Sequence, residues 1–135
     1  MTRCRFWQTT ATLKSSMIKF SVPTEPVPFK RVMTNGKRRY NDPRYSDFKY
    51  YVGLHARNAM HGAPFLGAVK MHVDFYKRTP KNPCSQRWGD GDNFLKAVMD
   101  ALQGVCYLND AQVLQGTFTK NFGDPHIVIE LEELQ

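Results

Sequence analysis

Alternating apolar and polar residues predict four β-strands and a hairpin. Residues 69–76 alternate most regularly, which is typical of a strand with one buried face. Residues 18–22, 112–120 and 127–131 are further runs that we interpret as strands. The pair Asn35-Gly36 stands between two short runs, and such a pair favours a tight hairpin turn.

Apolar residues at helical intervals predict two helices. The first starts at Asp42-Pro43 or at Ser46 and ends at Gly62. Its predicted buried stripe comprises Phe48, Val52, His55, Ala56, Ala59 and Met60. The second starts after Gly91, where Phe94 and the apolar residues behind it recur at the same spacing. The order strand, hairpin, helix, strand, helix, strand, strand predicts an α+β fold, in which the helices pack on one face of a mixed sheet.

The chain has 135 residues, which suits a single small domain. Its charge is uneven: residues 1–60 hold 12 Lys or Arg against 3 acidic residues, and residues 61–135 hold 7 against 9. A basic half beside an acidic half fits a protein that grips a polyanion and carries a metal where it cuts. The alternative is a soluble basic protein with scattered charge.

The three cysteines are odd in number and lack metal-ligand pairing, so we expect a reduced, cytoplasmic protein. No apolar run approaches the length of a membrane span, and the N-terminus lacks the apolar stretch of a signal peptide. The four histidines show no zinc spacing. We therefore expect neither a membrane nor a zinc site.

Three aspartates and a lysine carry the candidate chemistry. Asp90 and Asp92 are two residues apart, so they point the same way only if the chain is extended through them and the helix starts at or after Asp92. Asp92 or Asn93 would then be the N-cap. Lys96 follows one turn later on the same face and could reach a phosphate. This arrangement suggests a Mg²⁺ site that cuts a phosphodiester.

The other two aspartates differ in their expected roles. Asp100 lies about 12 Å of helix beyond Asp92, too far to share an ion, and we expect it to pair with Lys96. Asp110 follows the apolar residues 105–108, which are long enough for a strand or for a return to the helix start, and it is the candidate third carboxylate. The alternative is that Asp90 and Asp110 are ordinary turn residues.

At these residues the chain resembles a known family. The pattern Asp90-x-Asp92-Asn93-x-x-Lys96-Ala-x-x-Asp100-Ala-Leu, followed by Asn109-Asp110-Ala-Gln112, is similar to the signature of RusA-type Holliday junction resolvases. The resemblance runs from about Met17 to Leu134 and is most specific between residues 87 and 120. Two positions depart from the family pattern, because Asn109 stands where many members have a second acid and Gly91 replaces a larger apolar residue.

The resemblance implies a RusA-like domain over residues 17–135, acting as a homodimer on branched DNA. It implies an endodeoxyribonuclease that uses Mg²⁺, with Mn²⁺ able to substitute, and resolves Holliday (four-way) junctions by paired nicks in bacteria or their phages. Asp90, Asp92 and Asp110 would be the metal ligands, and Lys96 a catalytic cation. We expect residues 1–16 to be an N-terminal extension, disordered or translated from an upstream start codon.

The candidate DNA contacts are basic residues beside the hairpin and the acidic motif. They are Lys30, Arg31, Lys37, Arg38, Arg39, Lys81, Arg87 and Lys120. The alternative interpretation of the basic hairpin is an exposed turn that is simply solvated. The tyrosines Tyr40, Tyr45, Tyr50 and Tyr51 could stack on unpaired bases or belong to the core. Two other functions stay open: a nuclease for flaps or forks, and a non-catalytic DNA-binding module whose acids only cap a helix.

Overall fold

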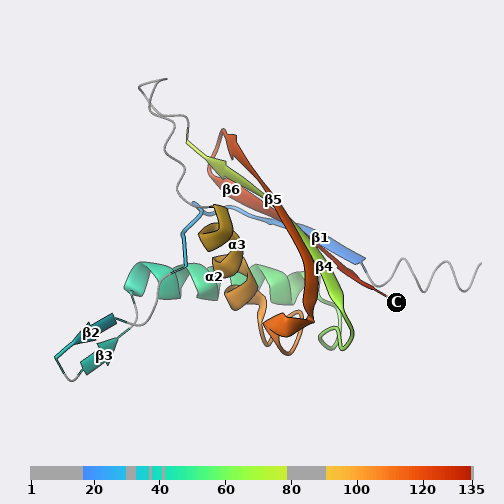
Figure 1. The fold of residues 1–135 in the computed structure, drawn as a ribbon. Helices are drawn as coiled ribbons and strands as arrows, with labels where there is room; N and C mark the ends of the chain where they lie inside the picture. Colours follow the sequence, from blue (N-terminus) through green and yellow to red (C-terminus); the bar gives the residue numbers. More distant parts are fainter. Residues whose placement is uncertain (1–16, 30–32, 37, 41, 79–90, 135) are drawn as a thin grey trace, which may run out of the picture.

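The computed structural model describes residues 17–29, 33–36, 38–40, 42–78 and 91–134. Its elements follow the predicted order (Figure 1). They are β1 (Met17–Val22), β2 (Met33–Asn35), β3 (Arg38–Tyr40), α2 (Pro43–Ala59), β4 (Val69–Lys77), α3 (Gly91–Leu102), the 3₁₀ turn η1 (Asp110–Gln112), β5 (Val113–Phe122) and β6 (His126–Glu133).

Four strands form one mixed sheet in the order β1-β6-β4-β5. The β4–β5 pair is parallel, whereas β4–β6 and β1–β6 are antiparallel. Both long helices lie on the same side of this sheet (Figure 1). The predicted α+β fold, with helices on one face of a mixed sheet, is therefore confirmed.

The strands β2 and β3 form a separate hairpin at the predicted position. Asn35 pairs with Arg38, and Gly36 has a φ of 66°, in the left-handed region that glycine adopts without strain.

The alternation in β4 decides which sheet face carries the core. Val69, Met71, Val73 and Phe75 are fully buried, whereas the residues between them are half-buried or exposed. The buried positions of α2 are Tyr45, Phe48, Val52 and Ala56. His55, Ala59 and Met60 are only half-buried, although we expected all three in the same buried stripe.

Asp100 joins the two long helices to each other. Its Oδ2 accepts a hydrogen bond of 2.7 Å from the Tyr45 hydroxyl and lies 3.2 Å from Lys49 Nζ. The predicted pairing of Asp100 with Lys96 is therefore wrong, because partners on α2, more than 50 residues away in sequence, take its carboxylate. Burial and the bond to Asp100 raise the pKa of Tyr45 above its ordinary value.

Residues 103–108 close the end of α3. Gly104 has a φ of 88°, a left-handed conformation that favours glycine after a helix end, and its N–H donates to the Tyr107 carbonyl. The buried Tyr107 hydroxyl donates back to the Met99 carbonyl at 2.6 Å. We had expected residues 105–108 to form a strand or to return to the helix start. They do neither. Cys106 is a core residue, and burial raises its pKa to about 12.

Among the described helices, none is both long and apolar enough to cross a membrane.

Replacing Tyr45 with Phe should lower the free energy of unfolding by about 1–2 kcal/mol, because a hydrogen bond to a carboxylate is removed with almost no change of shape. The matched control is Tyr50→Phe, since Tyr50 is 70% exposed. Urea unfolding of both variants checks this prediction, and equal stabilities would contradict the role given to the Tyr45 hydroxyl.

Candidate active site

The first turn of α3 lies against β5. Gly91 is buried, and a Cβ on it would collide with the ring of Phe118. In the same turn, Phe94 lies 5.8 Å from Phe75 between ring centroids. The absent side chain at Gly91 thus lets the helix start close to the sheet.

The helix starts at Gly91, one residue before the earliest start that our expectation allowed. Asp92 therefore lies in the first helical turn and is exposed, rather than at the end of an extended segment. The expectation of extended chain through Asp92 is wrong. An aspartate in this turn is favoured by the partial positive charge of the helix end, with or without a metal. Asp90 lies outside the described residues.

Lys96 lies one turn beyond Asp92 and is exposed. Its Nζ is 4.7 Å from the centroid of the Phe29 ring, a cation–π contact. The Phe29 N–H also donates to the Asn93 carbonyl at 2.9 Å. The segment after β1 is thus hydrogen-bonded to the first turn of α3, and its Phe29 ring lies against the Lys96 ammonium.

Lys120 lies at the same end of α3. It pairs in register with Phe75, whose side chain faces the helices and touches Phe94. Registered residues of parallel strands face the same side of a sheet, so Lys120 is on the helix side. The structure thus places Lys120 on the helix side of the sheet, at the end of α3 that carries Asp92 and Lys96.

Asp110 lies at the other end of α3. The helix and β5 run in opposite directions, since Gly91 meets Phe118 and Leu95 meets Gly116. Asp110 precedes β5, and the strand from Val113 to Phe118 alone spans about 17 Å. The structure therefore does not bring Asp110 to Asp92 within one chain.

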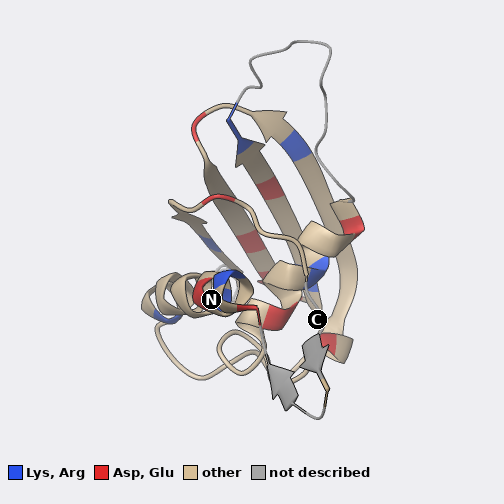
Figure 2. Ribbon diagram, turned by 90° about the vertical axis from the view of Figure 1, so that its left-hand side faces the viewer, with Lys and Arg blue, Asp and Glu red and all other residues tan. Residues whose placement is uncertain are grey.

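Acidic residues are spread over the helices, the sheet and its connections (Figure 2, red). In the described part of the chain, which does not include Asp90, no three His, Cys, Asp or Glu side chains are placed to hold a metal ion.

The side chains of Asn109 and Gln112 form hydrogen bonds that stabilise the turn around Asp110. The Asn109 side chain accepts from the Ala111 N–H at 2.8 Å and caps η1. The Gln112 Oε1 accepts from two backbone N–H groups, and its Nε2 donates to the carbonyls of Phe65 and Gly67. The spacing of Asn109 and Gln112 is that of a capping box, which could have signalled this role.

The remaining candidate DNA residues are placed only in part. Arg38 and Arg39 lie on β3 of the hairpin. The other five lie outside the described residues: Lys30, Arg31, Lys37, Lys81 and Arg87. Of the tyrosines, Tyr45 is core, whereas Tyr50 and Tyr51 are exposed and line a hollow of about 450 Å³ beside Arg44.

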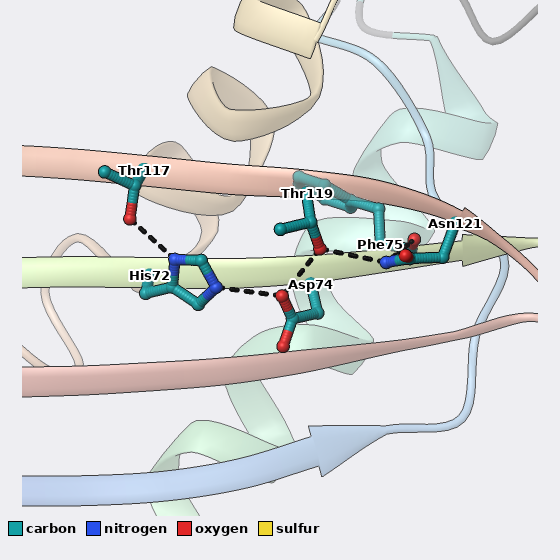
Figure 3. Close-up of polar contacts among 6 residues, drawn as sticks. All are labelled: His72, Asp74, Phe75, Thr117, Thr119 and Asn121. Carbon is teal, nitrogen blue, oxygen red and sulfur yellow. Dashed lines mark hydrogen bonds and ion pairs between the residues drawn. The ribbon is translucent and has the colours of Figure 1, made fainter.

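A second polar group lies on the sheet face that the helices leave open (Figure 3). The Nδ1 of His72 lies 2.6 Å from Oγ1 of Thr117, and its Nε2 lies 2.8 Å from Oδ1 of Asp74. Thr119 donates to the same Asp74 oxygen at 2.6 Å. Burial opposes the ionisation of Asp74, but the bonds from Thr119 and His72 outweigh it and lower its pKa. These partners satisfy one another across β4 and β5, so the group is best explained as a stabilising ladder.

Comparison with known proteins gives two matches. Residues 23–132 match the family model described as Endodeoxyribonuclease RusA. A relative described as the uncharacterized protein YqaN of Bacillus subtilis (strain 168) is 31% identical over 137 residues, covering 87% of this chain and 96% of the relative. The segment that matches the family model includes the whole of α3 and η1.

Gly91→Ala should destabilise the protein by about 1–3 kcal/mol, the usual cost of forcing extra volume into a packed site. The Phe118 ring must move for the new methyl group to fit. Gly53→Ala is the control, because its added Cβ would meet only the Ala101 carbonyl oxygen at 3.7 Å and alanine favours the helix interior. Thermal unfolding compares the two variants, and a Gly91→Ala protein as stable as the wild type would contradict the close packing.

Proposed function

Because this chain belongs to the RusA endodeoxyribonuclease family, we propose that it is a Mg²⁺-dependent endonuclease that resolves four-way DNA junctions by paired symmetric nicks. Its role would lie in recombination and repair in a bacterium or phage. The observation that carries the proposal is the family match across residues 23–132, which contains both acidic segments and the first turn of α3.

The residues fit a Mg²⁺ site in their chemistry. Carboxylate oxygens are the ligands that this ion takes from proteins, and Asp92 is exposed at a helix end where α3 meets β5. Asp90, Asp92 and Asp110 would supply the ligands, with Mn²⁺ as a possible substitute ion. The bound metal would activate a water and stabilise the leaving 3′-oxygen.

The cations of the site act on the phosphate. Lys96 lies one turn beyond Asp92, and in the proposed mechanism it neutralises charge that grows on the phosphate during the displacement. Lys120, on the same side of the sheet, and Arg87 hold the DNA backbone. Lys30, Arg31, Lys37, Arg38, Arg39 and Lys81 contact phosphates farther from the cut.

A homodimer would carry two such sites related by a two-fold axis. The four arms of a junction have approximate two-fold symmetry, so two related sites can cut opposite strands at matching positions. Paired cuts leave two duplexes, whereas a single cut leaves a nicked junction.

Asp92→Asn should abolish cleavage of a labelled four-way junction while leaving binding unchanged, or stronger without Mg²⁺, because a ligand and a repelling charge are removed with little change of shape. Asp100→Asn is the control on the same helix. It removes a charge about 12 Å away, and the asparagine oxygen can still accept from Tyr45. A tenfold loss of rate corresponds to an activation free energy raised by only ~1.4 kcal/mol. If Asp92→Asn still cut within about tenfold of the wild-type rate, Asp92 would not be a metal ligand.

Neutralising Arg38 and Arg39 together should weaken junction binding and make its salt dependence shallower. For each duplex phosphate that an arginine no longer neutralises, the slope of log affinity against log salt should fall by roughly 0.9. The control is Lys70→Ala with Arg57→Ala, two exposed cations on other surfaces. Binding measured over a salt series gives the slopes, and an unchanged slope for the Arg38 and Arg39 variant would mean that the hairpin is a solvated turn.

A further inference from the structure

The outer face of α2 carries two hollows that the proposed nuclease site does not use. The larger, of about 450 Å³, lies between the first half of α2 and the segment that follows β1, where it reaches Thr24, Glu25 and Val27. The smaller, of about 170 Å³, lies between α2 and the end of α3, where it reaches Ala101 and Val105. The larger hollow has a volume typical of ligand sites.

Tyr50 lines both hollows and stands between them. The buried residues of α2 face the sheet and α3, whereas Tyr50 lies on the opposite side of the helix and is 70% exposed. Leu54, one turn later, is 38% exposed and continues the same ridge. An aromatic ring between two hollows can be covered by flat groups from both sides.

The floor of the larger hollow is apolar and its rim is charged. Val27 and Phe48 are buried, whereas Glu25, Arg44 and Asp47 are exposed. Among the residues that the structure describes, these three charged side chains form no ion pair. An apolar floor with a few polar groups around it is typical of a ligand site. The two carboxylates repel phosphate, so a nucleic acid strand can enter this hollow with a base but not with its backbone.

The second exposed tyrosine of the larger hollow is held by a neighbour. Tyr51 is 37% exposed, and its ring lies 4.6 Å from the His55 ring between centroids, in an edge-on arrangement. The Nδ1 of His55 also lies 3.1 Å from the Tyr51 carbonyl oxygen. A side chain that is ordered before binding loses little conformational entropy when a ligand packs on it. The wall of the hollow therefore includes a ring that is already in place.

A single strand of DNA fits these features better than a duplex or a peptide does. Unpaired bases expose flat faces that stack on aromatic side chains, whereas the bases of a duplex are stacked on one another. Arg44, beside the larger hollow, can contact the phosphate next to an inserted base. A helical peptide would need one continuous apolar groove, but Tyr50 divides this surface into two hollows. The chain belongs to a DNA-cutting family, and the basic hairpin β2–β3 leads directly into α2.

We propose that the outer face of α2 is a binding site for single-stranded DNA, in which neighbouring bases enter the two hollows and stack on Tyr50 from both sides. Arg44 holds a phosphate beside the larger hollow. The site lies apart from Asp92 and Lys96, so it does not rest on the proposed nuclease function. It gives the protein a hold on an unpaired strand beside a branch point.

Fluorescence anisotropy with a labelled oligothymidylate of about ten nucleotides, in EDTA so that no strand is cut, tests this site. Tyr50→Ala should bind the strand at least about fivefold more weakly than the wild type, the lower end of what losing a stacked aromatic side chain costs. Tyr50→Phe should bind like the wild type because it keeps the ring, whereas Tyr50→Leu should not. The control is Leu66→Ala, since Leu66 is another apolar side chain that is 75% exposed.

The salt dependence of the same binding tests Arg44. In Arg44→Ala, the slope of log affinity against log salt should fall by about 0.7 for each single-strand phosphate that is no longer neutralised. Lys70→Ala removes an exposed cation from the open face of β4 and should leave the slope unchanged. Equal slopes for Arg44→Ala and the wild type would overturn the placement of a phosphate beside the larger hollow.

Cross-linking locates the bound strand directly. A 5-iodouracil base in the oligonucleotide couples to a stacked aromatic ring under ultraviolet light, and the cross-link should map to Tyr50 or Tyr51. A four-way junction with fully duplex arms is the control ligand, because it offers no unpaired strand, and Tyr50→Ala should bind it as the wild type does.

Four results would overturn the single-strand site. They are no binding of the oligonucleotide by the wild type, binding by Tyr50→Ala as tight as that of the wild type, cross-links confined to residues outside the two hollows, and an equal loss of junction binding in Tyr50→Ala. The last result would place Tyr50 in a contact with duplex DNA.

Discussion

The packing of α3 across β4 and β5 is the contact on which the rest of the arrangement depends. Phe94 meets Phe75, Leu95 approaches Gly116, and the backbone at Gly91 rests on the ring of Phe118. These contacts fix both the direction of the helix and its distance from the sheet. They place Asp92 and Lys96 at the same end of the helical layer as Lys120. Asp100 then fastens α3 to α2, which completes the helical layer.

The sequence was sufficient to predict the order of elements, because each long element carries a regular period of apolar residues. The alternation in β4 and the helical spacing after Gly91 both appear as predicted. The predictions fail where residues far away in the sequence determine the local structure or the pairing of a side chain. The Phe118 ring packs against the start of α3, and Tyr45 and Lys49 take the Asp100 carboxylate that we assigned to Lys96. The apolar run 105–108 is partly buried as expected for a strand, but it closes a helix because Gly104 turns the chain.

The candidate site shows the same division. Helical spacing correctly places Asp92 and Lys96 one turn apart, since this relation is local. The position of Asp110 is not local, because it follows from the direction of β5 relative to α3. The ladder from His72 to Thr119 could also be expected only in part, since alternation predicts which face the β4 residues take but not that β5 is the neighbouring strand.

We propose that this member of the RusA family cuts branched DNA with the help of a divalent ion. The most direct measurement incubates the protein with end-labelled four-way, three-way, flap and linear DNA, each with Mg²⁺ and with EDTA. We predict symmetric paired nicks in the four-way junction with Mg²⁺ only. Cutting of flaps or forks in preference would assign another branched substrate, and tight binding without any cutting under either condition would contradict the claim.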